Sequence, residues 1–235
     1  MNFDPPLISA TLQRRYKRFL ADVQLDNGKE LTVHTPNTGS MLGCAEPGTR
    51  IWLRDSANPG RKYRYSWELA STLEGTLVGV NTHLANVLVQ EGIESGVIER
   101  LQGYRTLRRE VKYGTNSRID LLLSDPGRAG CYVEVKNVTA VDRDSYAIFP
   151  DAPTERGRKH LQELAAMVRE GYRAVLLLHV ARDDVDRFRA AAEIDPAYAE
   201  QLAAVCQQGV EVYAWVSQIT PESIRIARSI PVHLP

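Results

Sequence analysis

The sequence predicts a mixed α/β fold in two parts, a β-rich segment over residues 1–80 and an α/β segment over residues 81–235. Three observations lead to this division. Short β-like runs alternate with turn signals in the first part, the hydrophobic spacing becomes helical at its end, and strand and helix patterns then follow one another. A chain of 235 residues can form one large domain or two small ones with proper cores.

The β-rich segment has the pattern of a small barrel or sandwich. Its clearest unit is RFLADVQLDNGKELTVHT, in which two strand candidates are joined by Asp26-Asn27-Gly28, a sequence that favours a hairpin turn. The runs TRIWLRD and TLVGVN continue the series, with Gly and Pro between them. Several short strands within about 75 residues suit a barrel of the oligonucleotide-binding (OB) size.

The α/β segment begins with a helix, predicted in NTHLANVLVQEGI from the spacing of Leu84 and Leu88. Strand candidates follow at 104–112, 118–124 and 131–141. After them come a helix in PTERGRKHLQELAAMVREGY that ends at Gly171, a buried strand RAVLLLHV, a helix PAYAEQLAAVCQQG and a last strand VEVYAWVSQ. The predicted order αβββαβαβ is typical of a sheet flanked by helices.

Charged residues interrupt two of these strands. Asp120 lies in SRIDLLL, and Glu134 and Lys136 lie in CYVEVKN, where the neighbours are apolar. A charge on a core strand is costly unless it is paired or binds a metal. Because alternate side chains share a face of a strand, Glu134 and Lys136 project together, about 7 Å apart. Folding the SDPGRAG hairpin can place Asp120 beside Glu134 across the ladder.

This arrangement suits metal-assisted hydrolysis of a phosphodiester. Two carboxylates close together repel each other, and a hard divalent cation such as Mg²⁺ or Mn²⁺ relieves that repulsion. Such an ion keeps several waters, one of which can attack a phosphodiester. Lys136 would orient or help to deprotonate that water, or stabilise the developing negative charge. The alternative is a solvated face, because Glu-x-Lys is common on exposed strands.

The order of these elements resembles the restriction-endonuclease-like PD-(D/E)xK core, whose signature is an Asp followed by Glu-x-Lys on the next strand. The resemblance extends along most of the chain. The stretches RYKRFLADV, PNTGSM, SRIDLLL, CYVEVKNVT and FPDAPTERGRKHLQEL together resemble the sugar fermentation stimulation protein family. That resemblance implies an OB-fold-like barrel over residues 1–80 and a nuclease-like domain over residues 81–235. It also implies non-specific DNA binding and a role in regulating maltose metabolism.

Carried over residue by residue, the resemblance assigns Asp120 and Glu134 as metal ligands and Lys136 as the catalytic lysine. It further implies an acidic residue on the preceding helix, for which Glu91 is the first choice and Glu94 the second. The expected cofactor is Mg²⁺ or Mn²⁺. Nothing at the Asp and Glu-x-Lys positions departs from the pattern of an intact site.

Basic and polar stretches are candidate DNA contacts. RRYKRF and RKYRY combine cations, which meet phosphates, with aromatics that can stack on bases; the alternative for the first is a charged edge strand. The candidate residues are Arg14, Arg15, Lys17, Arg18, Arg61, Lys62, Arg64 and, on the helix after residue 154, Arg156, Lys159 and His160. The last three lie at helical spacings and could face the cleft across from Glu134, although His160 and Arg156 could also form a solvated pair. PNTGSM could present backbone N–H groups to a phosphate or only turn the chain, and Asp151 could cap the helix or act as an outer ligand.

The composition limits the classes of function. Twenty-nine basic and twenty-nine acidic residues cancel, so any surface for nucleic acid must be local. Three scattered cysteines and no apolar signal or membrane-spanning run lead us to expect a soluble cytoplasmic protein with free thiols. Two hypotheses remain, a Mg²⁺- or Mn²⁺-dependent DNA nuclease and a catalytically silent DNA-binding regulator. A sugar-binding protein is less favoured, and a homodimer is one of the oligomeric states left open.

Overall fold

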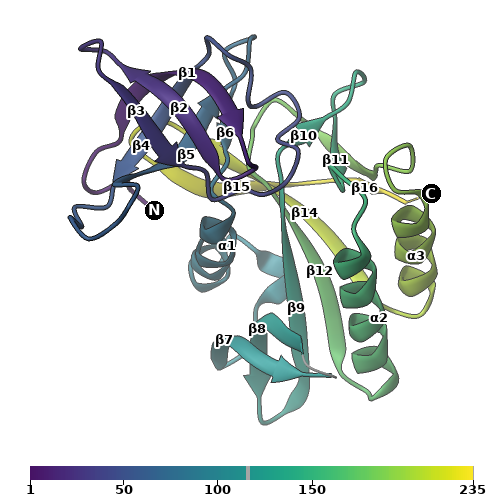
Figure 1. Ribbon diagram of the computed structural model, residues 1–235. Coiled ribbons are helices and arrows are strands. Elements are labelled where there is room, and N and C mark those ends of the chain that lie inside the picture. The colour runs from purple at the N-terminus through teal and green to yellow at the C-terminus, as the bar shows by residue number, and fades with distance from the viewer. Residues whose placement is uncertain (115–116, 235) are drawn as a thin grey trace.

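The first six strands form a closed β-barrel (Figure 1) in the computed structural model, which describes residues 1–114 and 117–234. The strands are β1 Ile8–Tyr16, β2 Leu20–Leu25, β3 Glu30–His34, β4 Arg50–Asp55, β5 Tyr65–Ser71 and β6 Leu77–Gly79. Their order is β3-β2-β1-β4-β5-β6, and a further β3–β5 pairing joins the ends, so β6 extends beyond the closed wall. Closure removes the open edges that a small sheet would otherwise expose.

Alternation of side chains along these strands builds the barrel core. On β1, Ala10 and Leu12 are fully buried while Gln13 and Arg14, where the strand bulges, are exposed. The predicted β2–β3 hairpin is confirmed, since Leu25 and Lys29 are joined by a backbone hydrogen bond across the turn. Gly28 has a φ of 83°, a left-handed conformation that glycine adopts without strain.

A second six-stranded sheet forms the centre of the α/β unit. It is built from β7 Thr106–Tyr113, β8 Ser117–Asp125, β9 Arg128–Val138, β12 Arg173–Val180, β14 Glu211–Ile219 and β15 Ile224–Ile230. The order is β15-β14-β12-β9-β8-β7, in which β9, β12 and β14 are parallel and the outer pairs are antiparallel. The central strand β12 is apolar throughout except for its ends and His179, as expected of a strand covered on both faces.

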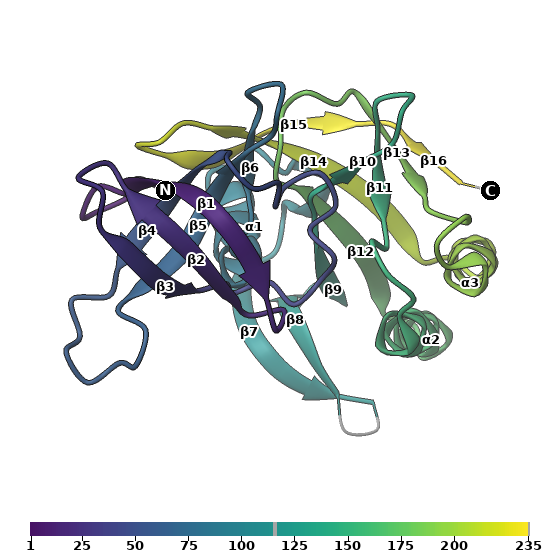
Figure 2. The ribbon, with the colours of Figure 1, turned by 45° about the horizontal axis from the view of Figure 1, so that its top comes forward.

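Helices cover both faces of this sheet (Figures 1 and 2). α1, Ala85–Glu94, packs with one apolar cluster on one face, and α2, Glu155–Arg169, and α3, Pro196–Gln207, pack with another cluster on the other face. Thr154 caps α2, with its hydroxyl accepting from the Gly157 N–H. Asp151 therefore does not cap this helix. No helix in the described ranges is long and apolar enough to cross a membrane.

Most of a small third sheet and one strand of the main sheet lie outside the predicted elements, while its strand Ala140–Val141 falls at the end of the strand predicted over 131–141. The small sheet is made of β10 Ala140–Val141, β11 Tyr146–Phe149, β13 Arg187–Ala190 and β16 Val232–His233, and two short 3-10 turns, Thr82–Leu84 and Glu99–Leu101, flank α1. Strands of two to four residues are too short to show a period in the sequence. β15, which pairs with β14 at the sheet edge, follows a short turn that carries no Gly.

Polar contacts fix the barrel against the α/β unit. The Gly79 N–H donates to Ala181 O, and Arg182, which is 3% exposed, donates to Thr139 O and pairs with Asp184. Thr76 of the barrel donates to the same Asp184 carboxylate. These bonds hold one face of the barrel beside the carboxyl ends of β9 and β12.

Candidate functional site

The candidate site lies where β8 separates from its neighbours. The β8–β9 ladder ends at the Leu121–Val133 pair, one residue before Asp120 would face Glu134. Asp120 instead turns its carboxylate to the freed backbone, where Oδ2 accepts from the Val135 N–H at 2.7 Å. Its Oδ1 accepts from Asn86 Nδ2 on α1 at 2.8 Å. The local break in the ladder is thus what directs a carboxylate of a core strand into open space.

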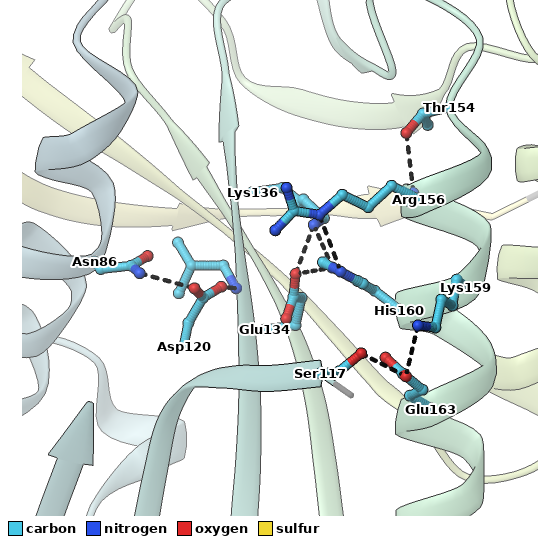
Figure 3. A network of polar contacts seen from close by, with 12 residues as sticks. Asn86, Ser117, Asp120, Glu134, Lys136, Thr154, Arg156, Lys159, His160 and Glu163 are labelled. Atoms are coloured by element: carbon cyan, nitrogen blue, oxygen red, sulfur yellow. Dashed lines mark hydrogen bonds and ion pairs between the residues drawn. The ribbon is translucent and has the colours of Figure 1, made fainter. Parts of the chain in front are cut away.

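Glu134 and Lys136 project from the opposite face of β9 to Val133 and Val135, as the period of a strand requires. Lys136 Nζ lies 2.6 Å from Glu134 Oε1. His160 Nδ1, from α2, contacts the same oxygen and is 3.0 Å from Lys136 Nζ. Figure 3 shows these three side chains converging between β9 and α2, with Asp120 to one side. Glu134 therefore has two cationic or hydrogen-bonding partners on one of its two oxygens.

The second oxygen of Glu134 is unsatisfied. Glu134 is 2% exposed, and its Oε2 has no hydrogen-bond partner among the described residues. A buried carboxylate oxygen without a hydrogen-bond donor is costly, and such an atom is suited to bind a water molecule or a cation. This oxygen and the Asp120 carboxylate suit a hard cation. No group of three His, Cys, Asp or Glu in residues 1–114 and 117–234 forms a ready-made metal site, so waters would complete the shell.

The two carboxylates differ in their electrostatic surroundings. Burial and the neighbouring Glu134 charge raise the pKa of Asp120 to about 6, against the hydrogen bonds from Val135 and Asn86. Burial also acts to raise the pKa of Glu134, but the hydrogen bond from His160 and the charge of Lys136 hold it below the usual value. Glu134 is therefore ionised at neutral pH, whereas the carboxyl group of Asp120 titrates close to neutral pH.

These residues open into a cavity of about 800 Å³ that both parts of the chain line. α2 contributes Arg156 and Lys159, which are exposed, besides His160. The barrel contributes the loop residues Asn37, Thr38 and Gly39. The β7–β8 pair contributes Glu110 and Arg118. The cavity is thus a cleft between the barrel, the sheet and α2, rather than a pocket within one domain.

The structure does not bring Glu91 to this cavity, which corrects its selection as the helix ligand. The Glu91 carboxylate pairs with the amino group of Met1 at 3.0 Å, and Glu94 is exposed and bonded to Gln90. The α1 residue beside Asp120 is Asn86. Asn86 and Glu91 are five positions apart, which is about 140° round an α-helix, so only one of them can face the sheet break.

His160, a candidate DNA contact, lies on the side of α2 that faces Glu134. It is 9% exposed, and its ring is held by Glu134, Lys136 and Arg156, whose Nε donates to Nε2 at 3.4 Å. The structure makes it part of the carboxylate network. Arg156 and Lys159 keep exposed side chains at the cavity, and Lys159 lies 3.6 Å from Glu163.

The basic residues predicted on the barrel lie outside the cavity lining. Arg14 pairs with Asp22 at 2.8 Å and Arg64 pairs with Asp55, while Lys17, Arg18, Arg61 and Lys62 are exposed. Arg15 is the exception, because its guanidinium turns inward and donates to Asn37 O and Gly39 O. Arg15 therefore supports a loop and is not the free surface cation that was expected.

Asn86, Glu110 and Arg118 are among the lining residues that lay outside the predicted set. Asn86 was hidden because an amide on a helix gives no charge signal. Glu110 and Arg118 sit on strands β7 and β8, where exposed charges are common. Glu110 has a φ of 53°. It lies between Arg109 and Val111, which pair with Leu121 and Ile119, the residues on either side of Asp120. A positive φ in a strand marks a distortion that periodicity cannot predict.

Comparison with known proteins agrees with this architecture. Residues 14–80 match the family model described as the SfsA N-terminal OB domain, and residues 83–223 match the sugar fermentation stimulation protein RE domain. A sugar fermentation stimulation protein homolog of Thioalkalivibrio sulfidiphilus is 54% identical over 100% of this chain and 98% of its own. The homolog of Shewanella loihica is 51% identical over the whole of both chains.

A solved structure is similar over the same length. The Pyrococcus furiosus SfsA protein, determined in complex with Ca²⁺, superposes with a TM-score of 0.89 at 27% identity and covers 100% of this chain and 98% of its own. The predicted fold class, an OB-type barrel followed by an α/β domain, is confirmed. With both family models and full-length relatives in agreement, the chain belongs to the sugar fermentation stimulation protein family.

Proposed function

We propose that this protein binds DNA without sequence preference and hydrolyses its phosphodiester bonds with the help of a divalent cation. The observation that carries the proposal is the unpartnered, buried Oε2 of Glu134 beside Asp120, whose pKa is raised to about 6. The first leaves a carboxylate oxygen able to bind a cation, and the second arises from the burial of Asp120 together with the neighbouring Glu134 charge. Mg²⁺ or Mn²⁺ is the cation proposed, and the Ca²⁺ complex of the Pyrococcus furiosus relative supports a site for hard divalent ions.

Asp120 and Glu134 would hold the cation, which when bound supplies Lewis-acid activation of water and of the phosphate. The other residues act around this position. Lys136 carries its amine to within 2.6 Å of Glu134 Oε1, so it can place a positive charge against the negative charge that develops on the phosphate. His160 fixes Glu134 and Lys136 in one geometry from α2. Arg156, exposed at the rim, can bind a neighbouring phosphate.

DNA as the substrate class is supported by the OB-type barrel and by the cations at the cavity. OB folds bind single strands through basic and aromatic surfaces. On this barrel Lys62 lies 5.5 Å from the Tyr63 ring and Arg64 lies 5.5 Å from the Tyr65 ring, so cations and aromatics occur side by side. The proposal extends to a role in regulating sugar metabolism, which the family name suggests, and maltose metabolism in particular, which the resemblance implied.

A second function is favoured by one observation. Lys136, Glu134 and His160 already satisfy one another on one carboxylate oxygen, which is also the arrangement of a structural ion-pair cluster. In that case the protein is a DNA-binding regulator that keeps the nuclease fold without cleaving DNA.

Incubation with labelled single- and double-stranded DNA in Mg²⁺, Mn²⁺ or EDTA separates the two functions. Wild type should cleave in Mn²⁺ and not in EDTA, and Glu134→Gln should abolish both cleavage and Mn²⁺ binding measured by calorimetry. Glu91→Gln is the matched control, because the same change on α1 lies outside the cavity and should leave both unchanged. Wild type that binds DNA but takes up no divalent ion at millimolar concentration would favour the regulator.

A further inference from the structure

The loop at residues 36–41, PNTGSM, forms the barrel side of the cavity, and one arginine of the barrel, Arg15, donates hydrogen bonds to its backbone. Nη2 of Arg15, on β1, donates to Asn37 O and to Gly39 O, each at 2.9 Å. Nη1 of the same guanidinium lies 3.3 Å from Ser40 O. Three carbonyl groups of the loop, those of Asn37, Gly39 and Ser40, therefore face Arg15. Because a carbonyl and the next N–H point in opposite directions in extended chain, this leaves N–H groups on the side away from Arg15.

The α/β unit holds the same loop from the other side. Asp151 Oδ2 accepts from Ser40 Oγ at 3.1 Å and from the Met41 N–H at 3.3 Å. Thr82, at the start of the turn before α1, donates to Pro36 O at 2.8 Å. The loop is thus bonded to both parts of the chain, and its position relative to the catalytic strands is set by these contacts.

Thr38, at the middle of this loop, is exposed and lines the cavity. In the part of the chain that the structure describes, neither its hydroxyl nor its N–H has a hydrogen-bond partner. The neighbouring Asn37, which is buried but lines the cavity, uses its Oδ1 to accept from the Gly39 N–H, and its amide Nδ2 has no acceptor among the described residues. Hydrogen-bond donors therefore gather on one wall of the cavity that also contains Glu134 and Lys136.

We propose that this loop binds a phosphate group of the DNA strand within the active-site cavity, through Asn37 and Thr38. The inference rests on the proposed function and adds a role for the barrel, which forms the second wall of the active site instead of binding DNA only on a separate face. Backbone and hydroxyl donors are the groups that bind phosphate without reading bases. Arg15 and Asp151 are positioning residues, because they hold the loop and do not reach the phosphate.

Two substitutions test the loop without changing charge. Thr38→Val removes the hydroxyl, and Thr38→Ser keeps it. Gly39→Ala displaces the loop, because a Cβ there would lie 2.6 Å from Asp151 Oδ2 and 3.1 Å from Asn37 Oδ1. Thr11→Val, on β1 and outside the cavity lining, is the matched control. Thermal unfolding of each variant checks that the fold is kept.

The measurement is the affinity of a short fluorescein-labelled single strand, by anisotropy in EDTA, beside Mn²⁺ binding by calorimetry. Thr38→Val should bind about tenfold more weakly, since a hydrogen bond to a charged phosphate is lost, and Gly39→Ala at least as weakly. Thr38→Ser and Thr11→Val should bind as wild type does, and Mn²⁺ binding should be unchanged in all four. Wild-type affinity in Thr38→Val and Gly39→Ala would overturn the inference.

The two proposals fail in different ways. Absence of cleavage by wild type overturns the nuclease and leaves the loop to be decided by DNA affinity. Loss of Mn²⁺ binding in Thr38→Val would assign the loop to the metal site and contradict a phosphate contact. Wild type without measurable affinity for DNA overturns both.

Discussion

Asp120 and Glu134 carry the same charge but are stabilised by different groups. Glu134 lies against Lys136 and His160, whose positive charge and hydrogen bonds keep its pKa low. Asp120 receives only the neutral N–H groups of Val135 and Asn86, which do not offset burial and the charge of Glu134. A site with one fixed anion and one anion that titrates near neutral pH takes up a cation together with release of a proton.

Substitution of Asp120 by Asn should remove one pH-dependent contribution to stability. In metal-free protein the raised pKa of Asp120 means that folding favours its protonated form. That contribution is full below about pH 4, the unfolded pKa, and is lost as pH rises through about 6. Asp120→Asn should therefore match wild type at low pH and be more stable by about 2 kcal/mol above pH 7.

Urea unfolding of both proteins in EDTA over this pH range measures the difference directly. Asp186→Asn, which changes an exposed carboxyl, is the control and should follow wild type. A stability difference between Asp120→Asn and wild type that does not change with pH would show that Asp120 keeps an ordinary pKa in the folded chain.

The charged residues of β8 and β9 could be placed together from the sequence, but the burial of their partner on α2 could not. A period of two puts Glu134 and Lys136 on one face, and one hairpin brings Asp120 near them. The helical spacing of His160 and Arg156 allowed either a position facing Glu134 across the cleft or a solvated pair. The burial of His160 depends on the rotation of α2 against β9, which packing of the whole sheet decides.

At the scale of single elements, α1 determines which residue meets the break in β8. The buried residues Ala85, Leu88 and Val89 fix the face of the helix that packs on the sheet. Asn86 lies at the border of that face and reaches Asp120, while Glu91 lies beyond it and reaches Met1. The sequence predicted the helix but not its rotation. A carboxylate on a helix indicates a metal ligand, whereas an amide such as Asn86 indicates no particular role.

Asn86→Asp should convert α1 into a source of a third carboxylate. In EDTA the new anion beside Asp120 replaces a hydrogen-bond donor, so the variant should lose about 1–2 kcal/mol of stability. In Mn²⁺ the loss should be recovered, and Mn²⁺ affinity by calorimetry should rise by about tenfold, because carboxylate ligands are preferred by hard cations. Asn27→Asp, in the exposed hairpin turn, should do neither. Unchanged Mn²⁺ affinity in Asn86→Asp would place the cation away from Asp120.

At the scale of the whole molecule, the cavity is formed by the packing of the barrel against the sheet and α2. Its walls come from residues far apart in sequence, such as Gly39 and Asp151. A hydrogen bond from Thr76 to Asp184 also joins the two parts. Periodicity predicts elements within a segment, so both parts could be predicted separately. Their orientation depends on polar contacts and on the packing of Leu69 and Leu77 in the apolar cluster of the sheet, and no local pattern in the sequence indicates such contacts.

The salt dependence of DNA binding tests how the two parts share the ligand. The chain has no net charge, so attraction for phosphate comes from local cations at the cavity and on the barrel. Wild-type affinity should fall steeply with salt, without preference for any sequence.

Two variants test which cations contact phosphate, Arg156→Gln at the cavity and Lys62→Gln in the β4–β5 loop. Each should lower the slope of log affinity against log salt by about one, because each removes about one phosphate contact. Arg225→Gln, on β15 and outside the cavity lining, should leave the slope unchanged. A slope altered only by Lys62→Gln would confine DNA to the barrel, and affinity independent of salt would exclude phosphate contacts as the basis of binding.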